Sequence, residues 1–358
     1  MWAPTATKVE LVTYQSDDVN AEVDKTIDMA SEDKGMWSAL VKNLASGTAY
    51  SYKLTFADGT VNVSADPYAT AAVANGERSV VLSSEDMGSA GDRMPEFGKT
   101  TDATIAEMNI RDFSINPNSG ISADKQGKYL GVVESGTKTA NGATSGLDYL
   151  KQLGVSHVQI MPMYDYGSVD ETGDLSYNAQ GAQNWGYDPE NYNVPEGSYS
   201  SDPSDPASRV TEMKQMVKGL HENDIRVIMD VVYNHVYNAA NHSFNKTVPG
   251  YYFRYDDNGS LVNNSGCGND TASERKMMRK YIVDSVTYWA KNYNVDGFRF
   301  DLMGLIDTET MKEVRAALDE IDPSIIILGE GWDMNTTMDE GEMTIQPNAY
   351  QVCLLYTS

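Results

Sequence analysis

The chain is poor in cysteine and in basic residues, and it has no long apolar run. Its 358 residues include two cysteines, too few for a disulfide framework and without neighbours at zinc-ligand spacing. The 27 lysines and arginines face 52 acidic residues, and the formal charge of -25 argues against nucleic acid or an anionic membrane as a partner. No apolar stretch approaches the roughly 20 residues of a membrane helix. A neutral or cationic substrate therefore suits this chain best.

The amino terminus lacks the charged and apolar regions of an export signal. Residues 8–14 already read as a strand of a domain that has begun. We therefore expect the natural N-terminus to lie further upstream. Localisation stays open between the cytoplasm and secretion by a bacterium.

Two hydrophobicity patterns divide the chain. Residues 1–78 show short alternating segments between turns, which predicts a small antiparallel β-sandwich. Residues 79–100 are rich in Gly, Ser and Asp and are predicted to be a linker. Residues 101–351 alternate strand-like and helical segments. This alternation predicts an α/β fold, an incomplete (β/α)8 TIM barrel with about its first five strands.

Apolar segments mark the predicted barrel strands. They span residues 105–113, 155–161, 225–232, 295–301 and 325–329. Between them, residues 210–223 have helical spacing of apolar side chains, and a capping box of Thr271 and Glu274 is predicted to open another helix.

Carboxylates end three of these strands: Asp230, Asp301 and Glu330. Each one alone is explained as well by loop capping as by function. Three at successive strand ends favour function, because parallel strands bring their carboxyl ends together and buried ionisable groups are costly unless they are paired or used. Two carboxyl groups across a cleft suit cleavage of a glycosidic bond.

Neighbouring residues suggest different catalytic roles for two of these carboxylates. Arg299 lies two residues before Asp301 on the same side of its strand, so its guanidinium can hold Asp301 ionised and oriented as a nucleophile. Glu330 lies beside Gly331 and Trp332, apolar surroundings that would keep it protonated as the acid.

Three motifs resemble the first conserved regions of the α-amylase superfamily, glycoside hydrolase family 13: residues 230–235, 297–301 and 329–333. The segment Asn-Trp-Gly-Tyr-Asp-Pro at 184–189 is similar to the signature of type I pullulanases, with Gln183 where that family usually has Tyr. The amino-terminal segment resembles carbohydrate-binding module family 48.

The resemblance implies a retaining glycoside hydrolase that cleaves α-1,6 branch linkages in pullulan, starch or glycogen. Asp301 would be the nucleophile and Glu330 the acid/base. Other positions would bind substrate or support the site: Arg299, His235, Tyr187, Asp230, Asn234, Trp332, Asp188 and Trp185.

Some of these positions have specific implied roles. His235, next to Asn234, would bond the sugar, and Tyr187 would stack beneath it. Asp230 would support Arg299 and His235 rather than react. For Trp332, a place in the core explains the residue nearly as well as a place at a subsite.

The sequence also departs from the family. The superfamily's fourth region, a His-Asp segment, is absent, and residues 352–358 differ from what the family has there. We expect these residues to be a non-native tail and the fragment to be inactive. An isoamylase or other debranching enzyme, and a non-catalytic α-glucan-binding protein, remain alternative hypotheses.

The expected partner is an α-glucan polysaccharide or oligosaccharide, with no nucleic acid and no membrane. The chemistry requires no cofactor, and no residue is assigned to a metal. Calcium is a candidate ligand because family members often bind it, although no loop has the spacing of oxygen ligands that marks a recognisable calcium site.

Overall fold

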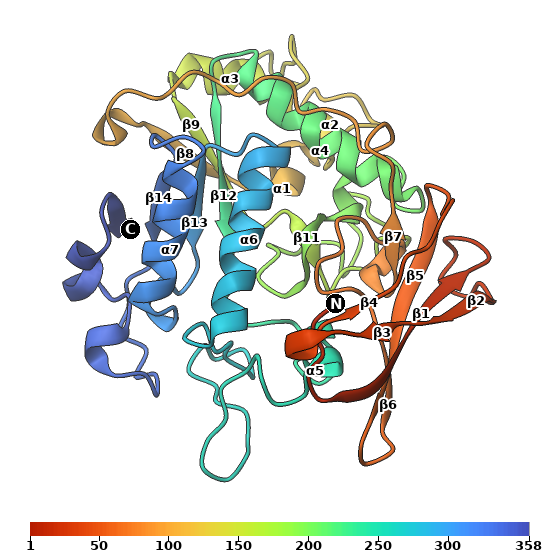
Figure 1. Cartoon of the computed structure of the whole chain (residues 1–358). Coiled ribbons are helices and arrows are strands. Elements are labelled where there is room, and N and C mark those ends of the chain that lie inside the picture. The colour runs from red at the N-terminus through yellow and green to blue at the C-terminus, as the bar shows by residue number, and fades with distance from the viewer. Residues whose placement is uncertain (358) are drawn as a thin grey trace.

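An antiparallel sheet forms the amino-terminal part of the molecule (Figure 1), which we describe from a computed structural model of residues 1–357. Its strand order is β2-β1-β5-β6, with β7 also paired to β5. In β5, Ala49 and Ser51 are buried between partly exposed neighbours, so one face packs inward. The strands are β1 (Ala6–Tyr14), β2 (Val23–Asp28), β5 (Thr48–Phe56), β6 (Val61–Ser64) and β7 (Ser79–Val81), with a ribbon of β3 (Ala30–Ser31) and β4 (Trp37–Ser38).

The segment predicted as a linker, residues 79–100, makes fixed contacts instead. It begins with β7, which belongs to the amino-terminal sheet. Further on, Arg93 Nε donates to Asp322 Oδ2 at 3.1 Å, and Arg93 Nη2 donates to the Val295 carbonyl at 3.0 Å. Lys214 and Asn294 also donate to backbone carbonyls of this segment, and composition does not reveal such long-range contacts.

The second sheet is parallel, in the order β15-β14-β13-β12-β9-β8, and forms part of an α/β barrel. Its strands are β8 (Ile105–Met108), β9 (His157–Ile160), β12 (Arg226–Val231), β13 (Gly297–Phe300), β14 (Ile326–Gly329) and β15 (Leu355–Thr357). The five predicted strands are present. The sixth, β15, lies in the predicted tail 352–358 and pairs with β14, while Ser358 lies outside the described residues.

Helices lie beside both sheets, most of them along the parallel sheet and one beside β6 of the amino-terminal sheet (Figure 1). They are α1 (Ile110–Ser114), α2 (Tyr129–Val132), α3 (Gly146–Leu153), α4 (Pro206–His221), α5 (Ser243–Thr247), α6 (Lys276–Asn292) and α7 (Thr308–Asp319). The apolar stripe predicted for residues 210–223 is confirmed, because Met213, Met216 and Leu220 are fully buried. Within the described residues, no helix combines the length and apolarity that a membrane span requires.

Two predicted boundaries are wrong. The strand predicted at 105–113 ends at Met108, because the Asn109 side chain accepts from the Asp112 N–H and caps α1. The capping box at Thr271 opens no helix, since Thr271 Oγ1 donates to the Tyr233 carbonyl and Glu274 pairs with Arg254. The helix α6 begins only at Lys276.

A hairpin interrupts the barrel between β9 and α4. Its strands are β10 (Tyr164–Tyr166) and β11 (Pro189–Pro195), and the loop between them carries the 184–189 motif. This loop therefore lies beyond the carboxyl end of β9, on the side of the barrel where the strand-end residues lie.

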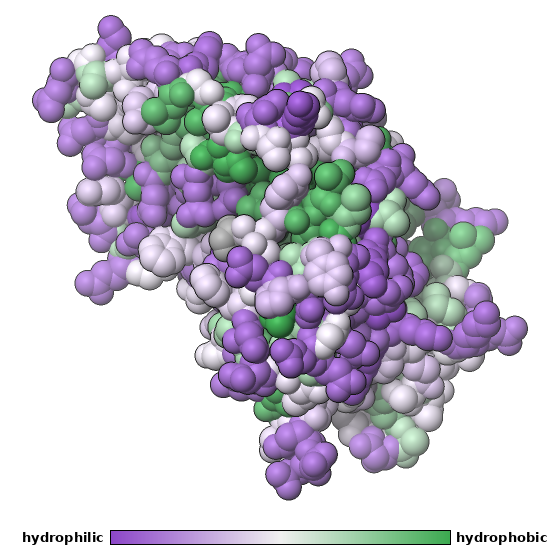
Figure 2. Space-filling model, turned by 90° about the vertical axis from the view of Figure 1, so that its left-hand side faces the viewer, coloured by the Kyte–Doolittle hydropathy of each residue, from purple (hydrophilic) through white to green (hydrophobic). Residues whose placement is uncertain are grey.

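In the described residues, β8 and β15 form the edges of the parallel sheet. Figure 2 views the side of the molecule that carries α7, β14 and the C-terminal segment, and shows apolar side chains gathered among hydrophilic ones. Ile105 of β8 and Leu354, next to β15, are 42% and 45% exposed. Exposed apolar side chains beside an open sheet edge favour association.

Candidate active site

The three strand-end carboxylates lie at the same edge of the parallel sheet. Asp230 of β12 is in register with Arg299 of β13, Asp301 directly follows β13, and Glu330 directly follows β14. The carboxyl ends of parallel strands meet at one edge, so residues far apart in sequence come together. We call Asp230, Arg299, Asp301 and Glu330 the strand-end site.

One guanidinium joins these carboxylates. Arg299 Nη1 donates to Asp230 Oδ1 at 2.9 Å and to Asp301 Oδ1 at 3.2 Å, and Arg299 Nη2 lies 2.6 Å from Glu330 Oε1. Burial works against the pKa of Arg299, but the surrounding carboxylates outweigh it and raise that pKa above its ordinary value. A permanently charged group thus fixes the positions of all three carboxylates.

Asp301 is held at both carboxylate oxygens. Arg299 contacts Oδ1, and Asn234 Nδ2 donates to Oδ2 at 3.0 Å. Burial raises the pKa of Asp301, while the hydrogen bond from Asn234 and the charge of Arg299 limit the rise. The side chain keeps 13% of its surface exposed. An oriented and still accessible carboxylate is what nucleophilic attack requires.

Glu330 has different surroundings from those that the sequence predicts. Its Oε1 contacts Arg299, and its Oε2 accepts from the Leu302 N–H at 3.1 Å. Trp332 is 57% exposed and does not form an apolar cover. The prediction of an apolar environment is therefore wrong, because Trp332 turns to solvent and the arginine of the neighbouring strand reaches Glu330 instead. Leu302 makes its contact from a left-handed backbone, with φ of 41°, which is a strained conformation.

Asp230 is the buried member of the strand-end site. Tyr187 Oη donates to Asp230 Oδ2 at 2.7 Å, and Arg299 donates to both oxygens. Burial raises the pKa of Asp230 to about 7, and the charge of Arg299 and the Tyr187 hydrogen bond oppose the rise. These contacts fit a residue that supports Arg299 rather than one that reacts.

His235 is engaged at both ring nitrogens. Nδ1 lies 2.6 Å from Asn234 Oδ1, and Nε2 lies 2.7 Å from the Tyr187 carbonyl. Burial lowers the pKa of His235, so the neutral ring can donate to only one of these two acceptors. A sugar hydroxyl can bind His235 only when one of these contacts opens.

The loop before β11 forms one wall of a cavity of about 650 Å³. Asn184 shapes this loop, because its Oδ1 accepts from the Gly186 N–H and its Nδ2 donates to Asp188 Oδ1 at 3.0 Å. Trp185 is 56% exposed, and the second oxygen of Asp188 is buried without a partner among residues 1–357. The cavity is lined by Ser168, Gln183, Asn184, Trp185, Tyr187, Asp188 and Tyr237.

Tyr237 is a wall residue that the sequence analysis missed. Its ring is 48% exposed and lies against Gly167, where an added Cβ would meet Tyr237 Cδ1 at 2.1 Å. The available signal was its position two residues after His235, in the same loop.

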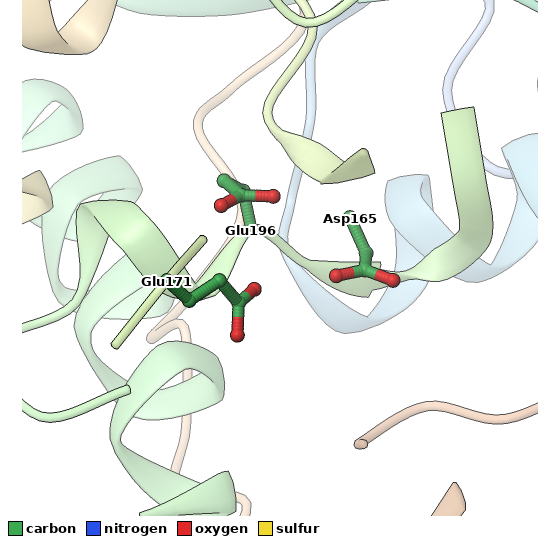
Figure 3. Close-up of side chains that lie close together, drawn as sticks. All are labelled: Asp165, Glu171 and Glu196. Carbon is green, nitrogen blue, oxygen red and sulfur yellow. The ribbon is translucent and has the colours of Figure 1, made fainter. Parts of the chain in front are cut away.

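A second group of carboxylates, also missed, surrounds Arg209. Asp165, Glu171 and Glu196 lie close together in Figure 3, from three separate segments. Arg209 Nη2 donates to Glu171 Oε2 at 2.6 Å, and Arg209 Nη1 lies 3.5 Å from Asp165 Oδ1. Burial raises the pKa of Glu196 to about 8 and raises that of Asp165 strongly. We call these four residues the Arg209 cluster.

The Arg209 cluster also joins the two parts of the chain. Glu171 Oε2 accepts from the Asn75 N–H at 2.7 Å, and Asn75 Oδ1 accepts from the Glu171 N–H at 2.8 Å. Gly197 lies so close that an added Cβ would meet Arg209 Nη2 at 2.3 Å. The guanidinium therefore occupies the space between the carboxylates, and this donor set does not fit calcium. The calcium suggested by the resemblance stays a prediction.

The parallel strands, with paired carboxylates and an arginine at their carboxyl ends, have the arrangement of an α/β-barrel catalytic domain. Family models agree, since residues 1–69 match carbohydrate-binding module 48 (isoamylase N-terminal domain) and residues 129–264 match the α-amylase catalytic domain. A pullulanase of Bacillus subtilis is 42% identical over 352 residues, which are 98% of this chain and 47% of that protein. Isoamylase 3 of rice is 31% identical over 300 residues, 76% of this chain and 37% of that protein.

Solved structures give the same result. A pullulanase from Paenibacillus barengoltzii, in complex with maltohexaose and α-cyclodextrin, superposes with a TM-score of 0.94 at 44% identity. The match covers 99% of this chain and 54% of that one. The chain is therefore homologous, over nearly its whole length, to part of the pullulanases of the α-amylase superfamily. It spans about half the length of the relatives that it matches.

Proposed function

We propose that this chain supplies the nucleophile and the acid/base of an α-1,6-glucosidase that removes branches from pullulan, starch or glycogen. The observation that carries the proposal is the contact of one guanidinium with both Asp301 and Glu330, beside a cavity walled by tyrosine and tryptophan. Because the two carboxylates contact the same arginine, they lie close together, as in glycosidases that retain anomeric configuration.

The reaction would run in two displacements. Asp301 attacks the anomeric carbon while Glu330 gives a proton to the departing oxygen of the branch linkage, which leaves a glycosyl ester on Asp301. Glu330 then takes a proton from water, and this water displaces the ester. The contact of Glu330 Oε1 with Arg299 Nη2 must open before that oxygen can face the departing oxygen of the substrate.

The site would also position a neutral sugar. Tyr187 offers an aromatic face, and its hydroxyl is fixed by Asp230 at 2.7 Å. A sugar ring presents C–H groups that pack on such a face, while its hydroxyls bind amides and carboxylates at the edge. The comparison with solved structures supports an α-glucan as the substrate. A pullulanase of Anoxybacillus that is 46% identical to this chain was solved in complex with maltotetraose.

Hydrolysis of pullulan by a full-length protein that contains this chain tests the proposal. Asp301→Asn should lower kcat by about 10⁴-fold or more, since it removes the nucleophile. A matched control is Glu309→Gln, on the exposed side of α7, which should leave the rate unchanged. Full activity of Asp301→Asn, or cleavage of linear amylose in place of pullulan, would overturn the proposal. The expected inactivity of the 358-residue chain alone stays a prediction that the same assay checks.

A further inference from the structure

A second cavity lies between the amino-terminal sheet and the barrel. Its volume is about 590 Å³. One side comes from β1, β5 and the turn before β7, and the other from β11 and the loop that leads into α5. The lining residues that matter here are Tyr14, Arg78, Glu190, Tyr237, Asn241 and Ser243. We call this cavity the interdomain groove.

The cavity walled by Trp185 and Tyr187, which we call the active-site cavity because Tyr187 donates to Asp230 of the strand-end site, shares Tyr237 with the interdomain groove. Their linings also meet at Gly167 of the groove and Ser168 of the active-site cavity, which are consecutive in the chain. The Tyr237 N–H donates to the Pro189 carbonyl at 2.8 Å, and its ring rests on Gly167. A half-exposed aromatic ring in a fixed position therefore stands at the junction of the two cavities.

Polar groups of the groove are available to a ligand. Within residues 1–357, the side chains of Asn241, Ser243 and Glu190 make no hydrogen bond to the protein. Arg78, in contrast, is occupied, because it lies 3.5 Å over the Tyr14 ring and donates to the carbonyls of Asp18 and Ala21. The groove thus offers amide, hydroxyl and carboxylate groups and the single ammonium of Lys246, which Glu77 and Glu190 in the same lining offset in charge. This lining suits a neutral ligand rich in hydroxyl groups and not a polyanion.

We propose that the interdomain groove is a second binding site for α-glucan, continuous with the active-site cavity across Tyr237. This inference rests on the proposed function and extends it. A linear arm of the glucan crosses the Tyr237 ring by its C–H face, and its hydroxyls meet Asn241, Ser243 and Glu190 in the groove. The amino-terminal module thereby takes part in selecting substrates with arms long enough to reach it.

Calorimetric titration of the full-length protein with linear maltotriose and maltohexaose tests this. Maltotriose fits one cavity, whereas maltohexaose can span both, so maltohexaose should bind about tenfold more tightly. Asn241→Ala should reduce this advantage to about threefold without changing maltotriose binding, since it removes hydrogen bonds in the groove alone. Tyr237→Ala should weaken maltohexaose about tenfold, and Tyr237→Phe should restore binding to within about twofold.

The control variant is Gln215→Ala, an exposed position on α4 in a separate surface hollow, which should change neither affinity. If maltohexaose still binds about tenfold more tightly than maltotriose in both Asn241→Ala and Tyr237→Ala, the longer ligand lies wholly in the active-site cavity. This result would overturn the proposal. Equal affinities for the two ligands would overturn it as well, while leaving the proposed function intact. Absence of binding by either ligand would instead contradict the proposed function and the groove together.

Discussion

The chain contains two groups of three carboxylates around one arginine, and the groups differ in their access to solvent. In the strand-end site, the side chains of Arg299, Asp301 and Glu330 keep 10%, 13% and 23% of their surface exposed. In the Arg209 cluster, the ion-paired side chains are at most 2% exposed. The same charges thus occur once where a substrate can reach them and once where it cannot.

Solvent access decides which of the two groups can react with a substrate and which can only stabilise the fold. Partly exposed carboxylates can exchange protons and approach a substrate, whereas fully buried ones are tied to the fold by the cost of removing them from water. A strongly raised pKa alone does not mark a reacting carboxylate, because Asp165 and Glu196 of the buried Arg209 cluster also have strongly raised pKa values. Access, together with position at the strand ends, is the reason for proposing the strand-end site as the reacting set.

The largest expected difference between the groups concerns stability. Arg209→Met would leave buried carboxylates without their countercharge and should lower the free energy of unfolding by about 3–5 kcal/mol. Arg299→Met should cost less, about 1–3 kcal/mol, because two of its three partners, Asp301 and Glu330, are partly solvated, although Asp230 is buried. Urea unfolding of the two variants of the chain checks the order. A larger loss for Arg299→Met would reverse the assignment of the two groups.

A second difference concerns pH. Glu196 holds its proton in the folded chain up to about pH 8, whereas an ordinary glutamate loses it near 4.5. Folding therefore takes up a proton between these values, and the free energy of unfolding falls as pH rises through them. Glu196→Gln should flatten this slope and gain roughly 1–3 kcal/mol relative to the parent between pH 6 and pH 8. Denaturant midpoints across that range measure it, and an unchanged slope would contradict the buried, protonated state.

The smallest expected effect lies within the strand-end site. Tyr187→Phe removes a hydrogen bond that lowers the pKa of Asp230, so that pKa should rise further above about 7. Asp230 would then take up its proton at higher pH, and the acid limb of kcat/KM should move upward by less than about one pH unit. Tyr177→Phe, at an exposed tyrosine, is the control. A downward move in Tyr187→Phe would show that Asp230 does not govern that limb.

The positions of the strand-end residues could be predicted because their sequence signals are local, whereas the roles of these residues stay predictions. Asp230, Asp301 and Glu330 each end an apolar run, and the parallel alternation of strands and helices fixes where such ends meet. Arg299 could be placed beside Asp301 from their spacing alone. Its reach to Glu330 depends on the register of β13 and β14, which no local pattern shows.

The Arg209 cluster and the interdomain groove had no such signal. Asp165, Glu171, Glu196 and Arg209 come from different segments, and their contacts exist only after the β10–β11 hairpin has folded against α4. The helix start predicted from the capping box at Thr271 was wrong for the same reason, because the deciding contacts are tertiary. Thr271 and Glu274 match a local motif, but tertiary hydrogen bonds to Tyr233 and Arg254 take both side chains.

The most direct test of Asp301 as the nucleophile is to trap the glycosyl ester. A full-length protein that contains this chain would be incubated with a fluorinated maltosyl donor, which forms the ester faster than water removes it, and then digested for mass spectrometry. We predict one added maltosyl group on the peptide that carries Asp301, and none in Asp301→Asn. An adduct on Glu330 or Asp230, or continued hydrolysis of pullulan by Asp301→Asn, would contradict this assignment.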